Sequence, residues 1–285
     1  MHSLTTHRIN SEVRSSSSSG VSTTPQTAYL IIDTESVPDG QLIKSIKYPD
    51  EQLTTEEAVR KAQNEARDTS WNQSDFLPVS FQYPVAIAVL RVSSDFRLIS
   101  IACLDAPQFR PIEIVRKFWN GITLNYPQAK LVTFNGRSFD MPLLELAAFR
   151  YGFSLKQYIQ TNRNRYNGPI DLFEWFTNHG AYRLNGGLNL LAKLLGKPGK
   201  MEISGDQVYE LFLQDRIKEI NNYCLFDTLD TYFVFLRTRV MTGELTLQDE
   251  QDRIDYAKDC LGKKIGEFPC LETYLKNWDN RSGLN

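Results

Sequence analysis

The stretch "AYLIIDTESVPDG", residues 28–40, places two carboxylates, Asp33 and Glu35, at the end of an apolar run. The run at 29–32 predicts a buried β-strand. Residues i and i+2 of a strand point to the same side and lie about 6–7 Å apart along it. Two negative charges on one side repel each other unless a positive charge lies between them. The stretch therefore predicts a positively charged partner for these two acids.

The composition is that of an ordinary globular protein, with 41% hydrophobic and 23% charged residues among 285. Lys and Arg number 32 against 34 Asp and Glu, so the net charge of −2 favours no class of partner. The four cysteines form no CxxC pair, which favours a reduced, cytoplasmic setting over a disulfide framework or a zinc site. No apolar run approaches the roughly 18 residues of a membrane span, so we expect no membrane association.

The first 27 residues are rich in Ser and Thr and lack the apolar core of a secretory signal. Such a segment cannot bury enough apolar surface to order itself. We therefore expect a disordered tail at 1–27 and exclude it from the fold.

From residue 28 onward, strand patterns alternate with helix patterns. Strands are predicted at 29–33, 84–92, 97–104 and 130–135, the middle two as a hairpin. Helices are predicted at 53–67, 111–127, 138–152, 171–176, 188–196, 205–243 with a break near Gln214, and finally at 247–260. This order predicts an α/β domain of three layers, in which α-helices cover a mixed β-sheet.

Three further polar groups stand where they can join Asp33 and Glu35. Asp140 lies in "FNGRSFD", in the first turn of the helix after the fourth strand. Tyr223 and Asp227 lie four residues apart in "YCLFD", on one face of the last long helix. Four neighbouring carboxylates require cations, and Mg²⁺ and Mn²⁺ prefer carboxylate and phosphate oxygens. Two such ions about 3.5–4 Å apart clamp a phosphodiester for in-line attack, so we predict a site for two Mg²⁺ or Mn²⁺ ions.

Taken singly, each of these residues also has an ordinary structural explanation. The helix dipole favours an acid in the first turn, which would account for Asp140. Asp227 would lie on a solvated helix face, Tyr223 would pack as an aromatic ring, and Glu35 would be a loop acid. The functional interpretation depends on the four acids and the tyrosine occurring together, each at its expected place.

The segments "IIDTE", "FNGRSFD" and "YCLFD" resemble the three motifs of the DEDDy 3′–5′ exonucleases, RNase H-like nucleases that include the proofreading domains of family B DNA polymerases. "FLPVSFQYPVAIAV" (76–89), "IDLFEWF" (170–176), "LNLLAKLLGKPGK" (188–200) and "YCLFDTLDTYFVFLR" (223–237) resemble the predicted stand-alone exonucleases related to that polymerase domain. The resemblance implies an RNase H-like exonuclease domain at 28–243, followed by a C-terminal helical extension at 244–285 that packs on it.

The resemblance also implies a role for each motif residue. Asp33, Glu35 and Asp227 would hold the first ion, and Asp33 would bridge to a second ion, of which Asp140 would be an outer or water-mediated ligand. Tyr223 would orient the attacking water or the scissile phosphate, because a tyrosine with a pKa near 10 is a poor base at pH 7. The implied reaction releases nucleoside 5′-monophosphates from the 3′ end of single-stranded DNA.

A basic segment accompanies the acidic site. Residues 130–200 contain ten Lys and Arg against four Asp and Glu, an excess that suits phosphate binding. Asn135 and Phe139 could equally be turn and core residues, and Lys200 could simply follow a glycine that ends a helix. Asp171 is predicted to cap the helix that it precedes. The residues predicted to contact nucleic acid are Thr34, Ser36, Asn135, Arg137, Phe139 and Lys200.

Two alternatives stay open at this stage. One is the same chemistry on RNA or on very short oligonucleotides, because these sites recognise a 3′ end mainly through its backbone. The other is a catalytically silent RNase H-like module that binds nucleic acid or a protein, although such a module has no reason to hold four acids together.

Overall fold

The computed structural model describes residues 26–71, 73–161, 163, 168–201 and 203–278. Residues 1–25 of the predicted tail and residues 279–285 of the predicted extension lie outside this range.

Five strands form one mixed sheet in the order β3-β2-β1-β4-β5. β2 runs antiparallel to both β1 and β3, whereas β4 runs parallel to both β1 and β5. The strands are β1 (Thr27–Pro38), β2 (Gln82–Ser93), β3 (Leu98–Cys103), β4 (Lys130–Thr133) and β5 (Ile170–Asp171). The sheet and its flanking helices confirm the predicted α/β class.

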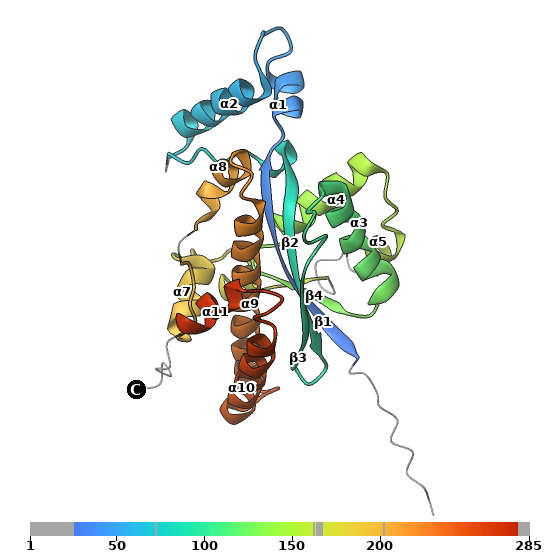
Figure 1. Ribbon diagram of the computed structural model, residues 1–285, viewed down its shortest axis with the longest axis vertical. Coiled ribbons are helices and arrows are strands. Elements are labelled where there is room, and N and C mark those ends of the chain that lie inside the picture. Colours follow the sequence, from blue (N-terminus) through green and yellow to red (C-terminus); the bar gives the residue numbers. More distant parts are fainter. Residues whose placement is uncertain (1–25, 72, 162, 164–167, 202, 279–285) are drawn as a thin grey trace, which may run out of the picture.

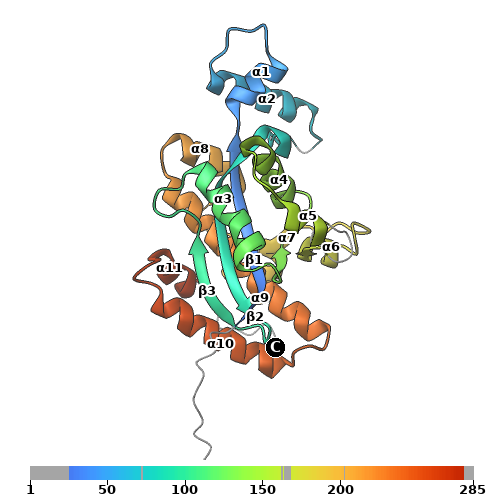
Figure 2. The same cartoon turned by 90° about the vertical axis from the view of Figure 1, so that its right-hand side faces the viewer.

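Helices cover both faces of the sheet (Figures 1 and 2). One face carries α3 (Pro111–Asn120), α4 (Asp140–Tyr151) and α5 (Lys156–Thr161). The other face carries α7 (Gly187–Leu194), α8 (Val208–Leu213), α9 (Ile217–Met241), α10 (Leu247–Lys263) and α11 (Cys270–Lys276). α6 (Leu172–Phe176) directly follows β5.

The alternation of side chains along β1 divides its residues between the two layers. Leu30 and Ile32 join the apolar cluster of α3 and α4, whereas Ile31 joins the cluster of α9. Because side chains of a strand alternate between its two faces, Asp33 and Glu35 point to the α9 face and Thr34 points to the α4 face. The sheet thus places the two acids under the long helix.

β1 extends well beyond the strand predicted at 29–33. Its pairing with β2 continues from Thr27 to Pro38, with a shift of register between Glu35 and Ser36. The two acids therefore lie within the paired part of the strand and not in a loop after it. β4 pairs with β1 only as far as Ile31, which leaves the β4-side edge of β1 open beside the acids.

Several helices differ from the prediction in extent. The α-helix predicted at 111–127 ends at Asn120 and continues as a π-helical turn, Gly121–Asn125. The predicted break near Gln214 separates α8 from α9, where Asp215 adopts a left-handed conformation with φ of 58°. The elements absent from the prediction are α1 (Gly40–Lys47), α5, α11 and β5, in addition to the 3₁₀ turns Val79–Phe81 and Gly205–Gln207.

α1 and α2 (Thr55–Thr69) form an insertion between β1 and β2, at the top of Figure 1. They enclose a small apolar core of their own that includes Ile43, Tyr48 and Val59. A capping box of Thr54 and Glu57 starts α2, at the threonine and acids with which the helix predicted at 53–67 begins. None of the helices in the described ranges combines the length and the apolar character needed to cross a bilayer.

The C-terminal helices are tied to α9 by buried polar contacts. Glu250 of α10 is 2% exposed and accepts two hydrogen bonds of 2.8 and 2.9 Å from Arg237. Tyr274 of α11 donates a hydrogen bond of 2.7 Å to Asp230, three residues beyond Asp227. The ring of Trp278 lies 4.8 Å from that of Phe233. α10 and α11 thus hold α9 from the side opposite the sheet.

We expect Tyr274→Phe to lower the free energy of unfolding by about 1–3 kcal/mol, because it removes the hydrogen-bond donor of a buried carboxyl group. The other oxygen of Asp230 has no hydrogen-bond partner among the described residues. Burial raises the pKa of Asp230 to about 7, so urea unfolding is measured at pH 8, where the carboxylate is mostly ionised. Tyr182→Phe, at a residue that is 55% exposed, is the matched control. Equal stability of the two variants would contradict the assignment.

Candidate active site

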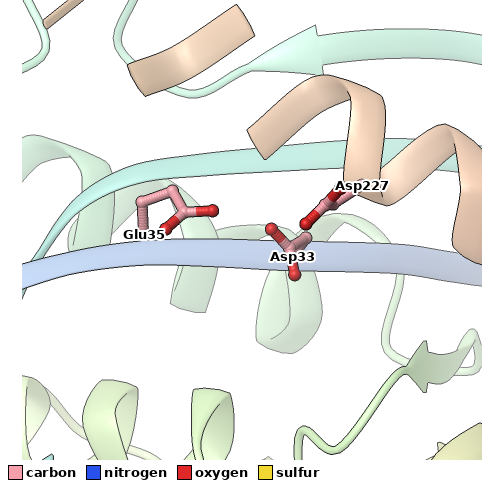
Figure 3. A group of neighbouring side chains, drawn as sticks. All are labelled: Asp33, Glu35 and Asp227. Carbon is pink, nitrogen blue, oxygen red and sulfur yellow. The ribbon is translucent and has the colours of Figure 1, made fainter. Parts of the chain in front are cut away.

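Three carboxylates meet between β1 and α9 (Figure 3). Asp33 and Glu35 project from β1 toward Asp227 on α9, and one oxygen of each lies within 4.8 Å of the others. Oδ2 of Asp33 is buried and has no hydrogen-bond partner among the described residues. Carboxylate oxygens at this spacing, one of them unsatisfied, are suitable ligands for a hard divalent cation.

Burial raises the pKa of all three acids, and the charges of neighbouring acids add to this effect for Asp33 and Glu35. Burial is the largest cause for Asp33 and Glu35. Burial also raises the pKa of Asp227 to about 6, although the hydroxyl group of Tyr223 and the charge of Lys200 oppose the shift. A cation within the cluster would reverse these shifts, because it favours the ionised carboxylates. The three carboxylates are therefore better suited to binding a metal ion than to lying side by side without a cation.

Contacts between α9 and β1 fix the position of Asp227 over the strand. The thiol of Cys224 donates a hydrogen bond of 3.2 Å to the carbonyl oxygen of Asp33. Further along, the rings of Tyr29 and Phe235 lie 5.1 Å apart. The helix is thus joined to the strand at the acids and again two turns away from Asp227.

Tyr223 lies one turn before Asp227 on the same face of α9, as the sequence predicts. Its hydroxyl group lies close enough to the Asp227 carboxylate that each group shifts the pKa of the other. Burial and the charges of Asp227, Glu35 and Asp33 raise the pKa of Tyr223 far above its ordinary value. At neutral pH the hydroxyl group is therefore protonated and able to donate a hydrogen bond.

Asp140 borders the acid cluster but is not one of the three carboxylates whose oxygens lie within 4.8 Å of one another. It is buried at the first turn of α4, and Oγ1 of Thr34 donates a hydrogen bond of 2.7 Å to its Oδ1. Burial raises the pKa of Asp140 to about 7, and its charge in turn raises the pKa of Asp33. The structure thus places three of the four predicted ligands together and the fourth close beside them.

The turn that carries Asn135 and Arg137 is held by Asp171. The Asp171 carboxylate accepts hydrogen bonds of 2.9 Å from the backbone N–H groups of Asn135 and Arg137. It also accepts one of 2.9 Å from Phe173, which makes it the predicted cap of α6. Asn135 has a positive φ of 65°, and a Cβ on Gly136 would lie 2.5 Å from Thr133. The sequence indicated the cap but not the link to the turn.

Three of the residues predicted to contact nucleic acid have partners within the protein. Thr34 bonds to Asp140, and the hydroxyl of Ser36 bonds to the side chain of Gln82. The guanidinium of Arg137 donates to the Pro169 carbonyl at 3.0 Å and lies 3.2 Å from the Glu174 carboxylate. The sequence indicates the hydrogen bond between Thr34 and Asp140 only through the alternation of β1, which places Thr34 on the other side of the strand from Asp33.

The last two residues predicted to contact nucleic acid besides Asn135 are Phe139, next to Asp140 in the chain, and Lys200, whose charge acts on the acid cluster. The ring of Phe139, directly before Asp140, lies 5.7 Å from that of Phe76, which is 54% exposed. Lys200 is exposed, and its backbone N–H donates a hydrogen bond of 2.8 Å to Asn189. Gly199 permits this approach, because it has a φ of 59° and a Cβ there would lie 2.5 Å from Asn189. The charge of Lys200 lowers the pKa of both Glu35 and Asp227.

Comparison with solved structures finds a family B DNA polymerase from the hyperthermophilic archaeon Pyrobaculum calidifontis, with 15% sequence identity and a TM-score of 0.45. The match covers 76% of this chain and 25% of the polymerase, so the chain spans about a quarter of that protein. Comparison with curated proteins finds no match.

Comparison with protein families gives a match over residues 74–278, which is most of the chain. The family is described as a predicted 3′–5′ exonuclease related to the exonuclease domain of PolB. The matched range contains Asp140, Tyr223 and Asp227, whereas Asp33 and Glu35 precede it. The chain therefore belongs to this family of predicted 3′–5′ exonucleases, and its acid cluster between β1 and α9 is the candidate active site.

Proposed function

We propose that the protein hydrolyses phosphodiester bonds at the 3′ end of single-stranded DNA and releases nucleoside 5′-monophosphates. Water adds to the phosphorus, and the bond to the 3′ oxygen of the preceding nucleotide breaks. The observation that supports this reaction is the group of three carboxylates with an unsatisfied buried oxygen, in a chain of an exonuclease family. The free state of all four cysteines supports a cytoplasmic setting.

The reaction as proposed requires two Mg²⁺ or Mn²⁺ ions. Asp33, Glu35 and Asp227 would hold one ion, and Asp33 would share the second with Asp140. Divalent ions at such a site make water more acidic and stabilise the charge on the leaving oxygen. Because Thr34 occupies Oδ1 of Asp140, the remaining oxygen of this carboxyl group would face the second ion, directly or through water.

The other residues of the site bind and orient the substrate in this proposal. Tyr223 directs its hydroxyl toward the scissile phosphate or the attacking water. Lys200 is the exposed cation whose charge acts on Glu35 and Asp227, so it is suited to a substrate phosphate. Phe139 and Asn135 would contact the terminal nucleotide. Thr34, Ser36 and Arg137 support the site through their partners within the protein.

We expect Mn²⁺ to stabilise the wild-type protein by about 2.7 kcal/mol at a concentration roughly 100-fold above its Kd. Asp33→Asn removes this stabilisation, because it replaces the carboxylate whose oxygen is buried and unpaired. The same change raises the unfolding temperature of the metal-free protein, because it removes one charge from the acid cluster. Differential scanning fluorimetry with and without Mn²⁺ measures both effects. Asp68→Asn, exposed on α2, is the control, and a wild-type Mn²⁺ shift in Asp33→Asn would contradict the assignment.

Single-stranded oligonucleotides labelled at either end test the reaction itself. With Mn²⁺, we expect a ladder of shortened products from a 5′-labelled strand and a labelled mononucleotide from a 3′-labelled strand. EDTA and Asp33→Ala should each reduce cleavage to background, because both remove the metal from the site. An RNA strand in parallel tests the alternative substrate. Absence of metal-dependent shortening of both strands would favour the silent binding module.

Tyr223→Phe separates a positioning role from proton abstraction. The variant loses one hydrogen bond to a charged group, so we expect kcat to fall about 10- to 100-fold while metal-dependent cleavage persists. Since Tyr223 stays protonated, its loss should leave the shape of the pH–rate profile unchanged between pH 6 and 9. Loss of a basic limb from that profile in Tyr223→Phe would show that the hydroxyl group does ionise.

A further inference from the structure

A cavity of about 650 Å³ opens beside Tyr223 and Asp227, between α9, the segment 198–201 and α11. Its size falls in the range of roughly 300–1,000 Å³ that is usual for ligand sites. Because Asp227 belongs to both the cavity and the acid cluster, and Tyr223 lies between them on α9, a ligand in this cavity reaches the acid cluster. α11 supplies one wall through Cys270 and Thr273.

The walls of the cavity favour an anion. Lys193, Lys200 and Lys218 line it, and the ammonium groups of Lys200 and Lys218 have no ion-pair partner in the described part of the chain. Lys193 donates a hydrogen bond to the carbonyl oxygen of Pro198. The one acid in the cavity besides Asp227, Glu219, is paired with Arg216 through contacts of 2.6 and 2.7 Å. The positive charge of the walls is therefore available to a ligand.

The cavity is long and has aromatic walls. Lys218 and Asp227 lie nine residues apart on α9, which corresponds to about 13 Å at 1.5 Å per residue. This length exceeds one nucleotide even for an extended single strand, in which neighbouring phosphates lie roughly twice as far apart as the 3.4 Å rise of duplex DNA. Tyr223 and Phe226 line the same walls; the ring of Tyr223 is buried, and the half-buried ring of Phe226 offers a surface to a base.

We propose that this cavity binds the part of the single strand on the 5′ side of the scissile phosphate. Lys200 contacts a phosphate next to the acid cluster, and Lys218 contacts one farther along the strand. The inference rests on the proposed exonuclease function. A terminal nucleotide on the 3′ side ends within the site, whereas the 5′ side continues and requires positive charge at a distance from the acids. α11 of the C-terminal extension is then part of the substrate-binding surface.

A comparison of two substrates isolates the contribution of the cavity to binding the strand on the 5′ side of the scissile phosphate. The p-nitrophenyl ester of thymidine 5′-monophosphate contains the scissile phosphate and the terminal nucleotide but no strand on the 5′ side, whereas an octanucleotide contains all three. We expect Lys218→Ala to raise KM for the octanucleotide about three- to tenfold more than KM for the ester, with kcat little changed. It should also reduce the slope of log binding constant against log salt for the octanucleotide by about 0.7, the value for one phosphate contact of a single strand.

Matched variants complete the experiment. Lys218→Arg should restore most of the affinity for the octanucleotide, because it keeps the charge. Lys276→Ala removes a lysine of α11 that lies outside the cavity and is 71% exposed, so both KM values should stay at wild type.

The outcomes distinguish this inference from the proposed function. If the wild type cleaves neither substrate, the exonuclease proposal fails and this inference fails with it. If the wild type cleaves both but Lys218→Ala affects them equally, or if the salt slope is unchanged, the cavity does not bind the strand while the exonuclease proposal stands.

Discussion

Electrostatic repulsion among Asp33, Glu35 and Asp227 is the constraint on which the rest of the structure depends. Three carboxylates whose oxygens lie within 4.8 Å of one another disfavour the folded chain when they are ionised, because burial adds to the cost of their charges and the charge of Lys200 offsets only part of it. The fold holds them together through apolar contacts elsewhere. β1 is paired along both acids, and α9 is buried on nearly all sides. The arrangement is reasonable for a protein whose acid cluster is completed by cations.

The position of α9 is determined from two sides, and both bear on the same few residues. On the sheet side, Cys224 bonds to the carbonyl oxygen of Asp33, so the helix cannot shift along β1 without breaking a contact at the acid itself. On the outer side, Tyr274 bonds to Asp230, three residues beyond Asp227. The extension beyond Gly243 is therefore more than a cover for an apolar surface. It fixes the helix that carries Tyr223 and Asp227, and it lines the cavity that opens beside them.

The predictable features of this protein are those with a local pattern in the sequence. The alternation of β1, the capping box of α2 and the spacing of Tyr223 and Asp227 depend on neighbouring residues, and all three appear in the structure. The full length of β1 was not predictable, because it depends on pairing with β2 across an insertion of two helices. The contact of Thr34 with Asp140 joins residues 106 positions apart, and the sequence contains no signal of it beyond the side of the strand on which Thr34 lies.

The basic segment at 130–200 shows why charge counted along a chain differs from charge at a surface. Arg137, Arg150 and Arg163 pair with Glu174, Asp39 and Glu145, so these three cations neutralise acids within the protein. Lys197 is buried, and burial lowers its pKa to about 8. Lys200 stays exposed next to the acid cluster, and the second unpaired lysine of the cavity, Lys218, comes from outside the segment. The positive charge that lines the cavity is thus brought together by the folding of α9 and α11 around residues 198–201. Its extent follows from tertiary contacts and not from the local excess of lysine and arginine.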